Sequence, residues 1–411
     1  MDAAVRSLTS LDIPRADKPD TPHLTSAAGA ADVELALISD RKAFDALEDE
    51  WNALFERAGK SIHVFQTFNF CWHWASHYLA DTSANAGTKL SIVTGRRNGR
   101  LIMIWPLVSE RTHGVTQTFW LGEPVAQYGD ALVDPEPDAE AILRAGLAFA
   151  RRHVASDVLR LRRVRADANV AGLFADAGAS IADRQIAPYM DLSSAKDFAA
   201  FEERFSSRAR RNRRRLARRL EEKGPIEFVR LHGGVNAGDL AADAIAVKAE
   251  WLKDRGLVSN ALSDQRTTSL FADLAAGREK PVPCVVSALK SNGEIAAYEV
   301  SFTCKGRLVI HVMAFKLDFE KAGVGVLLLE QNLKQGFVEN LATYDMMAPG
   351  DPYKLDWCDK SEAVVDWVMP TSLRGFLYAR VYLGFLRPRL KSALKAIPQP
   401  LRRILRNVAA A

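Results

Sequence analysis

The sequence predicts a mixed α/β protein with two related lobes, and three observations support this prediction. The chain has 411 residues, of which 48% are apolar and 26% charged, so it can bury full cores in two or three domains. Segments with alternating apolar residues and segments with helical spacing follow one another along the chain. Their order in residues 32–188 recurs loosely in residues 189–370. The composition excludes a mainly disordered, collagen-like or coiled-coil protein.

The first lobe begins with an apolar strand at 33–38, after an expected disordered leader at 1–31. Apolar residues at helical spacing predict a helix over 41–58, and the aromatic segment 65–79 predicts a largely buried helix. A turn at 97–99, with the sequence Arg-Asn-Gly, favours a hairpin. The remaining elements are expected as strands at 89–95, 100–108, 116–121 and 158–163, helices at 136–154 and 168–177, and a strand ending at Ile186.

The second lobe begins with a basic helix over 195–223, which Gly224 and Pro225 end. Turn sequences at 291–293 and 305–306 separate three successive strands. The expected order is a strand at 226–231, helices at 237–255 and 266–276, strands at 282–289, 295–304 and 307–314, a helix at 326–340, and strands at 341–347 and 363–369.

Charge is concentrated in two segments. Residues 204–223 hold ten Arg or Lys and two Glu, and residues 374–411 hold nine Arg or Lys and no acid, although the whole chain has a net charge of only +5. Such patches attract phosphate, nucleic acid or anionic membranes. The tail at 371–411 mixes cations with Leu, Ile, Phe and Tyr, and we expect it to lie at an anionic membrane surface. The alternative is that it packs on the body as ordinary helices.

The sequence contains no run of about 18 uncharged apolar residues, so we expect no membrane-spanning helix. Four cysteines without CxxC spacing predict reduced thiols in a cytoplasmic protein, not a disulfide scaffold. His73 and His77 share a helix face, but no third ligand accompanies them, so no metal site is expected. We therefore predict a cytoplasmic protein associated peripherally with the inner membrane.

The segment most suited to chemistry runs from Leu308 to Asp345. A strand leads through a glycine-bearing loop into a helix and then into another strand. Gly323 and Gly325 lie where the loop meets the helix, and the first amides of a helix are unpaired and carry partial positive charge. A pyrophosphate binds well there, so Gly323, Val324, Gly325 and Val326 are candidate phosphate ligands. An ordinary strand-to-helix turn is the alternative.

A series of short motifs over residues 40–370 resembles one family. In chain order they are Trp51-Asn52-Ala53-Leu54, Phe65-Gln66-Thr67-Phe68, Trp72-His73-Trp74, residues 100–107, 188–192, 206–214 and 322–328, Tyr344-Asp345, and residues 350–354. The family is the CelD-like, cellulose-biosynthesis-type acetyltransferases of the GNAT superfamily, which are related to the FemABX aminoacyltransferases. The resemblance implies tandem GNAT-like lobes, at 32–188 and 189–370, with the active cleft between them or on the second.

The resemblance also implies that acetyl-coenzyme A donates an acyl group to an amino sugar or a similar precursor of the cell envelope or of an exopolysaccharide. Such a reaction needs a base for the amine proton and an acid for the leaving thiolate. Candidate catalytic residues by position are Glu299, His311, Asp345 and Tyr353, and candidate substrate ligands are Asp351, Lys354, Arg211 and Arg214. Each has an ordinary alternative, such as a surface ion pair, a core histidine or a loop cap.

Two other functions remain open. The superfamily's phosphate turn begins with Arg or Gln, whereas Glu320 stands there in this chain. That departure and the basic segment 204–223 favour an aminoacyl-tRNA donor, as in FemABX relatives. The same segment could instead bind a nucleotide, a phosphorylated substrate or a lipid-linked saccharide. In that case the protein could be a non-catalytic, nucleotide-responsive module that regulates polysaccharide synthesis.

Overall fold

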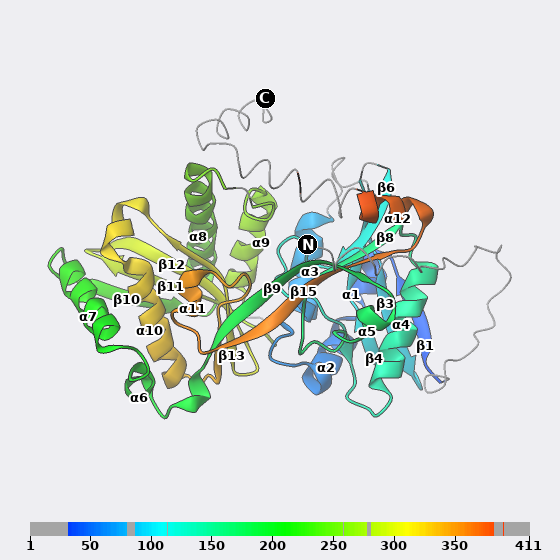
Figure 1. Cartoon of the computed structure of the whole chain (residues 1–411), viewed down its shortest axis with the longest axis horizontal. Helices are drawn as coiled ribbons and strands as arrows, with labels where there is room; N and C mark the ends of the chain where they lie inside the picture. Colours follow the sequence, from blue (N-terminus) through cyan, green and yellow to red (C-terminus); the bar gives the residue numbers. More distant parts are fainter. Residues whose placement is uncertain are drawn as a thin grey trace, which may run out of the picture.

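The computed structural model describes residues 32–79, 87–112, 114–257, 259–277 and 281–381, and Arg389. The expected leader at 1–31 and the tail after 381, apart from Arg389, lie outside this part of the chain. Two α/β lobes lie side by side and share one sheet, which confirms the predicted fold class (Figure 1). None of the helices in these ranges is both long and apolar enough to traverse a bilayer.

The first lobe has the expected succession of elements, with some of them divided. The predicted helix over 41–58 is two helices, and the strands at 89–95 and 100–108 each become two. Its elements are β1 (Glu34–Ile38), α1 (Arg41–Asp45), α2 (Glu48–Ala58), η1 (Val64–Gln66), α3 (Phe68–Tyr78), β2 (Thr88–Leu90), β3 (Ile92–Arg97), β4 (Arg100–Trp105), β5 (Leu107–Thr112), β6 (Val115–Trp120), β7 (Leu132–Val133), α4 (Ala139–His153), β8 (Val158–Arg165), α5 (Leu173–Asp176) and β9 (Ser180–Asp191).

In the second lobe, the basic segment forms two helices and not one. The side chain of Ser206 accepts a hydrogen bond from the amide of Ala209, so a new helix begins there. The elements are η3 (Leu192–Ser194), α6 (Phe198–Glu202), α7 (Ser207–Glu221), β10 (Ile226–Leu231), α8 (Val235–Asp254), α9 (Gln265–Ala276), β11 (Cys284–Ser291), β12 (Glu294–Cys304), β13 (Arg307–Phe315), η4 (Leu317–Ala322), α10 (Val324–Val338), β14 (Thr343–Asp345), α11 (Pro352–Leu355), β15 (Lys360–Pro370) and α12 (Leu373–Leu377).

One 11-stranded sheet continues through both lobes in the order β10-β11-β12-β13-β14-β9-β15-β8-β6-β5-β2. Strands β9 and β15 are paired antiparallel along nearly their whole length, and they cross the middle of the molecule (Figure 1). β9 also pairs with β14 of the second lobe, whereas β15 pairs with β8 of the first. The predicted boundary at 188/189 therefore lies inside a strand that serves both lobes.

Helices cover both faces of the sheet in the second lobe. Helices α8 and α9 contact strands β11–β13 on one face, and α10, with α7 outside it, covers the other. The lobes are also joined by α3, which packs against α9. The rings of Phe65 in the first lobe and Phe302 in the second are 6.1 Å apart within one continuous core. The relative placement of the lobes is thus fixed by buried apolar contacts.

The beginning of the tail is docked on the first lobe. Tyr378 packs against Val115, Val158 and Val368, and its hydroxyl lies 3.3 Å from Oε1 of Gln117. A Cβ at Gly375 would lie only 1.6 Å from the carbonyl oxygen of Asp157, so α12 lies directly on the backbone there. The folded body therefore extends past Pro370, where the sequence placed its end.

Candidate active site

The strands β13 and β14 separate and leave a cleft in the second lobe. They pair in parallel only from Arg307 and Thr343 to Val309 and Asp345, after which β13 continues for six residues without β14. The pairing of β13 with β12 skips His311, which forms a β-bulge at the point of separation. A cavity of about 240 Å³ occupies the gap.

Strand β13, the segment after β14 and two helices line this cleft. Residues 310–313 of β13 form one wall and residues 346–348, after β14, form the other. Lys248 of α8 and Gln127 of the first lobe also face it, together with Asp351, Tyr353 and Lys354. The sequence predicts that the last three and His311 belong to the site, and the structure brings these four together at one cavity.

The glycine turn lies beside the cleft. Gly323 has a left-handed backbone with a φ of 69°, and a Cβ there would lie 2.8 Å from Cδ1 of Leu216, so α7 covers this residue closely. Gly325 is more open, since a Cβ would lie 3.7 Å from Phe315 and 3.9 Å from Met313. Met313 also lines the cleft. The start of α10 is therefore one side chain away from the cavity.

The amides at the start of α10 have the arrangement expected of an anion site. The amides of Val326 and Leu327 both donate to the carbonyl of Gly323. The amides of Val324 and Gly325 come before these two in the helix, where amides have no intrahelical acceptor. The dipole of this four-turn helix adds partial positive charge. A diphosphate would find bare amides and favourable charge here.

The acidic residue in the turn is paired. Glu320 forms an ion pair with Arg255, the residue that follows α8, and this guanidinium lies 4.0 Å from the ring centroid of Trp251. Lys248 lies on the same ring, at 4.5 Å. Burial and the charge of Arg255 lower the pKa of Lys248. The carboxylate of Glu320 thus sits among cations, which reduces its repulsion of a phosphate.

Glu299 is buried on the α10 side of the sheet and does not line the cleft. Its Oε2 accepts a hydrogen bond of 2.6 Å from the hydroxyl of Tyr344, and Oε1 lies 3.3 Å from the hydroxyl of Ser301. Burial raises the pKa of Glu299. Its contacts are therefore with the core of the lobe and not with the cavity.

His311 reaches across to the first lobe. Its Nε2 lies 2.9 Å from the carbonyl oxygen of Val125, so this nitrogen is the protonated donor. Burial lowers the pKa of His311 to about 4, which leaves the ring neutral at pH 7. Among the described residues, its buried Nδ1 has no hydrogen-bond partner. His311 can therefore accept a proton or a hydrogen bond at the cleft, but only as a weak base.

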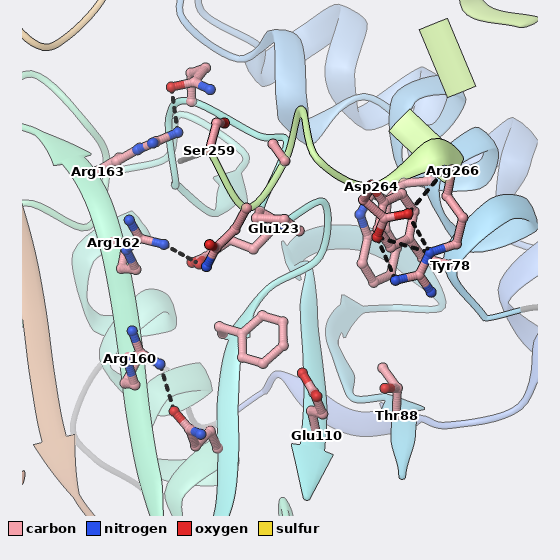
Figure 2. Close-up of a pocket in the computed structure, with 17 residues that line it drawn as sticks. Tyr78, Thr88, Glu110, Glu123, Arg160, Arg162, Arg163, Ser259, Asp264 and Arg266 are labelled. Atoms are coloured by element: carbon pink, nitrogen blue, oxygen red, sulfur yellow. Dashed lines mark hydrogen bonds and ion pairs between the residues drawn. The ribbon is translucent and has the colours of Figure 1, made fainter. Parts of the chain in front are cut away.

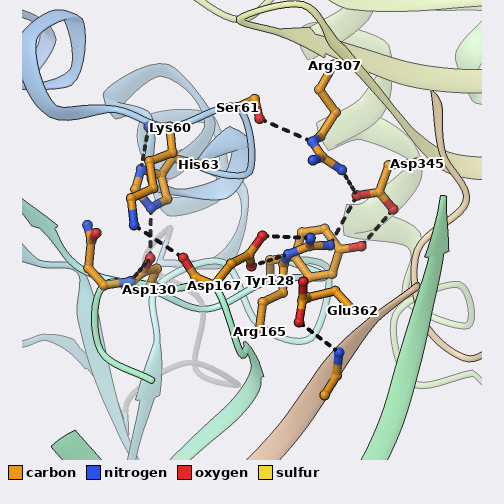
Figure 3. Close-up of polar contacts among 12 residues, drawn as sticks. Lys60, Ser61, His63, Tyr128, Asp130, Arg165, Asp167, Arg307, Asp345 and Glu362 are labelled. Carbon is orange, nitrogen blue, oxygen red and sulfur yellow. Dashed lines mark hydrogen bonds and ion pairs between the residues drawn. The ribbon is translucent and has the colours of Figure 1, made fainter. Parts of the chain in front are cut away.

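Asp345 connects the lobes and does not line the cleft (Figure 3). Oδ1 accepts from the hydroxyl of Tyr128 and from the amide of Met347, each at 2.8 Å. Oδ2 accepts from Arg307 at 2.9 Å and from Arg165 at 3.3 Å. Both oxygens of this fully buried carboxylate are therefore engaged in bonds that position the second wall of the cleft.

Tyr353 and Lys354 lie at the cleft on α11. Partial burial and the carboxylate of Asp351 raise the pKa of Tyr353 to about 12, so its hydroxyl stays protonated near neutrality. Lys354 is buried, which lowers its pKa, and Nζ donates to the carbonyl of Met347 over 3.0 Å. Nζ is 3.9 Å from the carboxylate of Asp351. These residues can donate protons to a bound group and fix the wall that holds it.

Arg211 and Arg214 lie on the exposed face of α7, away from the cleft lining. Arg211 lines a surface depression with Arg208, Asn212 and Arg215. Arg213 differs from its neighbours because it is buried, with ion pairs to Glu202 and Glu330. The basic helix thus has one structural arginine and a solvent-facing row of others.

A second, larger cavity lies between the lobes, and the sequence analysis missed it (Figure 2). Its volume is about 770 Å³, and it is lined by charged residues of both lobes, among them Arg160, Arg162, Glu123, Asp264 and Arg266. We call it the interlobe chamber. The sequence pattern that could have predicted this chamber is Arg160 and Arg162 at alternate positions of a strand, because this spacing places two cations on one face of a sheet.

Comparison with known proteins shows what the chain resembles. Residues 207–355 match the family model described as the acetyltransferase (GNAT) domain. A search of curated proteins found no match. FemX aligns at 10% identity over 81% of this chain and 98% of its own, with a TM-score of 0.54.

Two further solved structures align over similar lengths. A conserved protein of unknown function from Bacteroides thetaiotaomicron VPI-5482 has 12% identity, covers 81% of this chain and 100% of its own, and has a TM-score of 0.51. A tandem GNAT protein from the clavulanic acid biosynthesis pathway has 14% identity, 82% and 99% coverage, and a TM-score of 0.46. The family match includes the cleft and the glycine turn. The second lobe therefore contains a GNAT acetyltransferase domain, and the protein is an acyltransferase.

Proposed function

We propose that the protein transfers an acyl group from acyl-coenzyme A to an amine of an amino sugar or a similar precursor in cell-envelope or exopolysaccharide biosynthesis. The observation that carries this proposal is the cleft between β13 and β14, because Met313 lines it and also lies beside Gly325 at the start of α10. One elongated donor can place its diphosphate at Val324 and Gly325 and its thioester in the cleft. The CelD-like motifs motivate the choice of acceptor.

In this proposal, the residues at the cleft have separate roles. The amides of α10 bind the diphosphate, and Lys248, which lines the cleft, adds positive charge. Tyr353, whose hydroxyl is protonated at neutral pH, donates to the leaving thiolate. Lys354 and Asp345 hold the wall at residues 346–348 through their bonds to Met347. The neutral ring of His311 holds the bulge against the first lobe.

The proposed site of action is the cytoplasmic face of the inner membrane. The nine cations and absent acids of residues 374–411 support it, since anionic lipids attract such segments. A lipid-linked saccharide would be presented at that surface. This part of the proposal rests on the sequence of the tail.

Calorimetry with acetyl-coenzyme A tests the donor site. Gly325→Asp introduces a carboxylate at the first turn of α10, where acids favour the helix but repel a diphosphate. We expect binding to weaken at least about tenfold, equivalent to about 1.4 kcal/mol. Gly325→Ala is the matched control, since its Cβ meets only ordinary contacts, and it should bind as the wild type does. Equal affinity of the wild type and Gly325→Asp would contradict the donor site.

An aminoacyl-tRNA donor is the second candidate, and the exposed arginines of α7 favour it. Leu216 of the same helix packs on Gly323, so α7 adjoins the donor turn. A charged tRNA should then bind with strongly salt-dependent affinity. Replacing both Arg211 and Arg214 by Gln should reduce the salt dependence and leave acetyl-coenzyme A binding unchanged. Binding of acetyl-coenzyme A without binding of charged tRNA would reject this candidate.

A further inference from the structure

The interlobe chamber adjoins the cleft. Gln127 lines both cavities, and so do adjacent residues of one loop, since Ala261 faces the chamber and Leu262 the cleft. With about 770 Å³, the chamber has the size of a small-molecule site. Strands of the first lobe form one side and residues 259–266 of the second lobe form the other. A molecule in the chamber would thus lie next to a thioester in the cleft.

Arginines from β8 point into the chamber (Figure 2). Arg162 bonds to Asp366 through Nε and to Glu123 through Nη1, each at 3.2 Å. Arg160 donates to Oε1 of Gln117 over 2.6 Å. A guanidinium has five N–H donors, so the bonds of Arg162 leave capacity for a ligand. Planar donors of this kind suit a phosphate or carboxylate group.

Glu123 is the carboxylate that pairs with Arg162 at the chamber. Its side chain is 12% exposed, and Oε2 is the atom that lies near Arg162. Within the described ranges, its Oε1 has no hydrogen-bond partner. Burial raises the pKa of Glu123, the charges of Arg162, Arg160 and Arg163 oppose this rise, and Asp366 adds to it. Glu123 is two residues from Val125, which bonds to His311 at the cleft.

The contrast with Asp345 argues against a purely structural role for Glu123. Asp345 is also buried and faces two arginines, but each of its oxygens accepts two hydrogen bonds. A buried carboxylate that only holds the fold is normally satisfied in this way. Glu123 lines the chamber, yet its Oε1 is buried and, among the described residues, unpaired, and a buried polar atom that lacks a partner is one that a bound group could satisfy.

We propose that Glu123 is the general base of the transfer, and that Arg160 and Arg162 bind an anionic group of the acceptor in the interlobe chamber. This inference rests on the proposed function. The acceptor nitrogen attacks the thioester carbonyl, a C–N bond forms, and the C–S bond breaks. Glu123 takes the proton from the nitrogen, and the departing thiolate takes one from Tyr353, which solvent reprotonates. The acceptor class is an amine that also carries a phosphate or carboxylate.

Anion recognition can be tested without a donor. The probes are glucosamine 6-phosphate and glucosamine, measured by calorimetry against the full chain. We expect the phosphorylated sugar to bind at least tenfold more tightly and Arg162→Gln to abolish this preference. Arg162→Lys should retain part of it. Arg144→Gln is the control, because Arg144 pairs with Glu140 and Asp176 on the outer surface. Binding of neither sugar, or equal binding of both, would overturn the proposed acceptor class.

The role of Glu123 is tested by coenzyme A release from acetyl-coenzyme A with glucosamine 6-phosphate between pH 5 and 9. We expect Glu123→Gln to lower the rate by about 10²–10⁴-fold and to remove the fall in rate toward acid. Glu123→Asp should restore part of the rate, and the exposed Glu140→Gln should match the wild type. Undiminished turnover in Glu123→Gln, or an unchanged pH profile, would overturn the assignment.

Acetyl-coenzyme A binding distinguishes a failure of the proposed base from a failure of the proposed donor site. If the wild type and Glu123→Gln bind it equally, a loss of turnover belongs to Glu123. If the wild type does not bind it, the proposed donor is wrong, whereas the sugar-binding result still decides the acceptor class. Thermal unfolding of each variant shows whether it is folded.

Discussion

The hydroxyl of Tyr128 in the first lobe donates to Oδ1 of Asp345 at the end of β14 in the second, over 2.8 Å. Burial and the carboxylate of Asp345 raise the pKa of Tyr128, which therefore remains a donor. Arg165, also from the first lobe, lies 4.8 Å from the ring centroid of Tyr128 and bonds to the same carboxylate. The wall of the cleft after β14 is thus held by residues of both lobes.

Asp345→Ala should strongly destabilise the protein. It leaves the cations of Arg165 and Arg307 without their shared buried partner, and removing one member of a buried ion pair costs about 3–5 kcal/mol. The free energy of unfolding from urea denaturation measures the effect. Asp176→Ala is the control, because that carboxylate is 58% exposed. A loss below about 1 kcal/mol would show that the network does not join the lobes.

Gly323→Ala should destabilise the protein, whereas Gly325→Ala should not. The left-handed backbone at Gly323 costs a residue with a Cβ about 1–2 kcal/mol, and the new methyl would meet Leu216. Gly325 has no such restriction. Denaturation of the two variants gives the comparison, and adding Leu216→Ala to Gly323→Ala separates the steric part from the backbone part. Equal stability of the two glycine variants would contradict the description of this turn.

His311 should make the protein less stable at acidic pH. Its pKa is about 4 in the folded state and about 6.5 when unfolded, so between these values the unfolded chain binds one more proton. Stability from this group is complete above pH 6.5 and falls by about 1 kcal/mol per pH unit as the pH drops toward 4. His311→Gln cannot titrate and should show a shallower loss. Urea denaturation at pH 7, 6 and 5 measures both slopes, and parallel slopes would contradict the prediction.

Deleting residues 382–411 should remove binding to anionic vesicles without lowering the melting temperature. The deleted segment holds seven cations, whereas the docked residues up to Val381 remain. Deleting 372–411 should lower the melting temperature as well, because it uncovers Val115, Val158 and Val368. Sedimentation with phosphatidylglycerol vesicles and thermal unfolding provide the two readouts. Full vesicle binding after the shorter deletion would reject a membrane role for the tail.

Local sequence patterns determined much of this protein. Apolar periodicity predicted nearly every strand and helix of the second lobe within a few residues, and the glycines at 323 and 325 marked the start of α10, because such features depend on neighbours in the chain. Position in the chain and the motif resemblance predict that His311, Asp351, Tyr353 and Lys354 belong to one site, and all four line the same cleft.

Only the tertiary structure decided how the strands are shared and which carboxylate faces a cavity. β15 pairs with β8, about 200 residues away in the chain. Arg162 on β8 donates a hydrogen bond to Glu123, which lies in the loop after β6. The sequence predicts a catalytic role for Asp345 from its place at a strand end and for Glu299 from its place within a strand that could face the cleft. Their bonds to distant residues occupy both carboxylates within the core. Burial and long-range pairing, which no local pattern encodes, distinguish an occupied carboxylate from an available one.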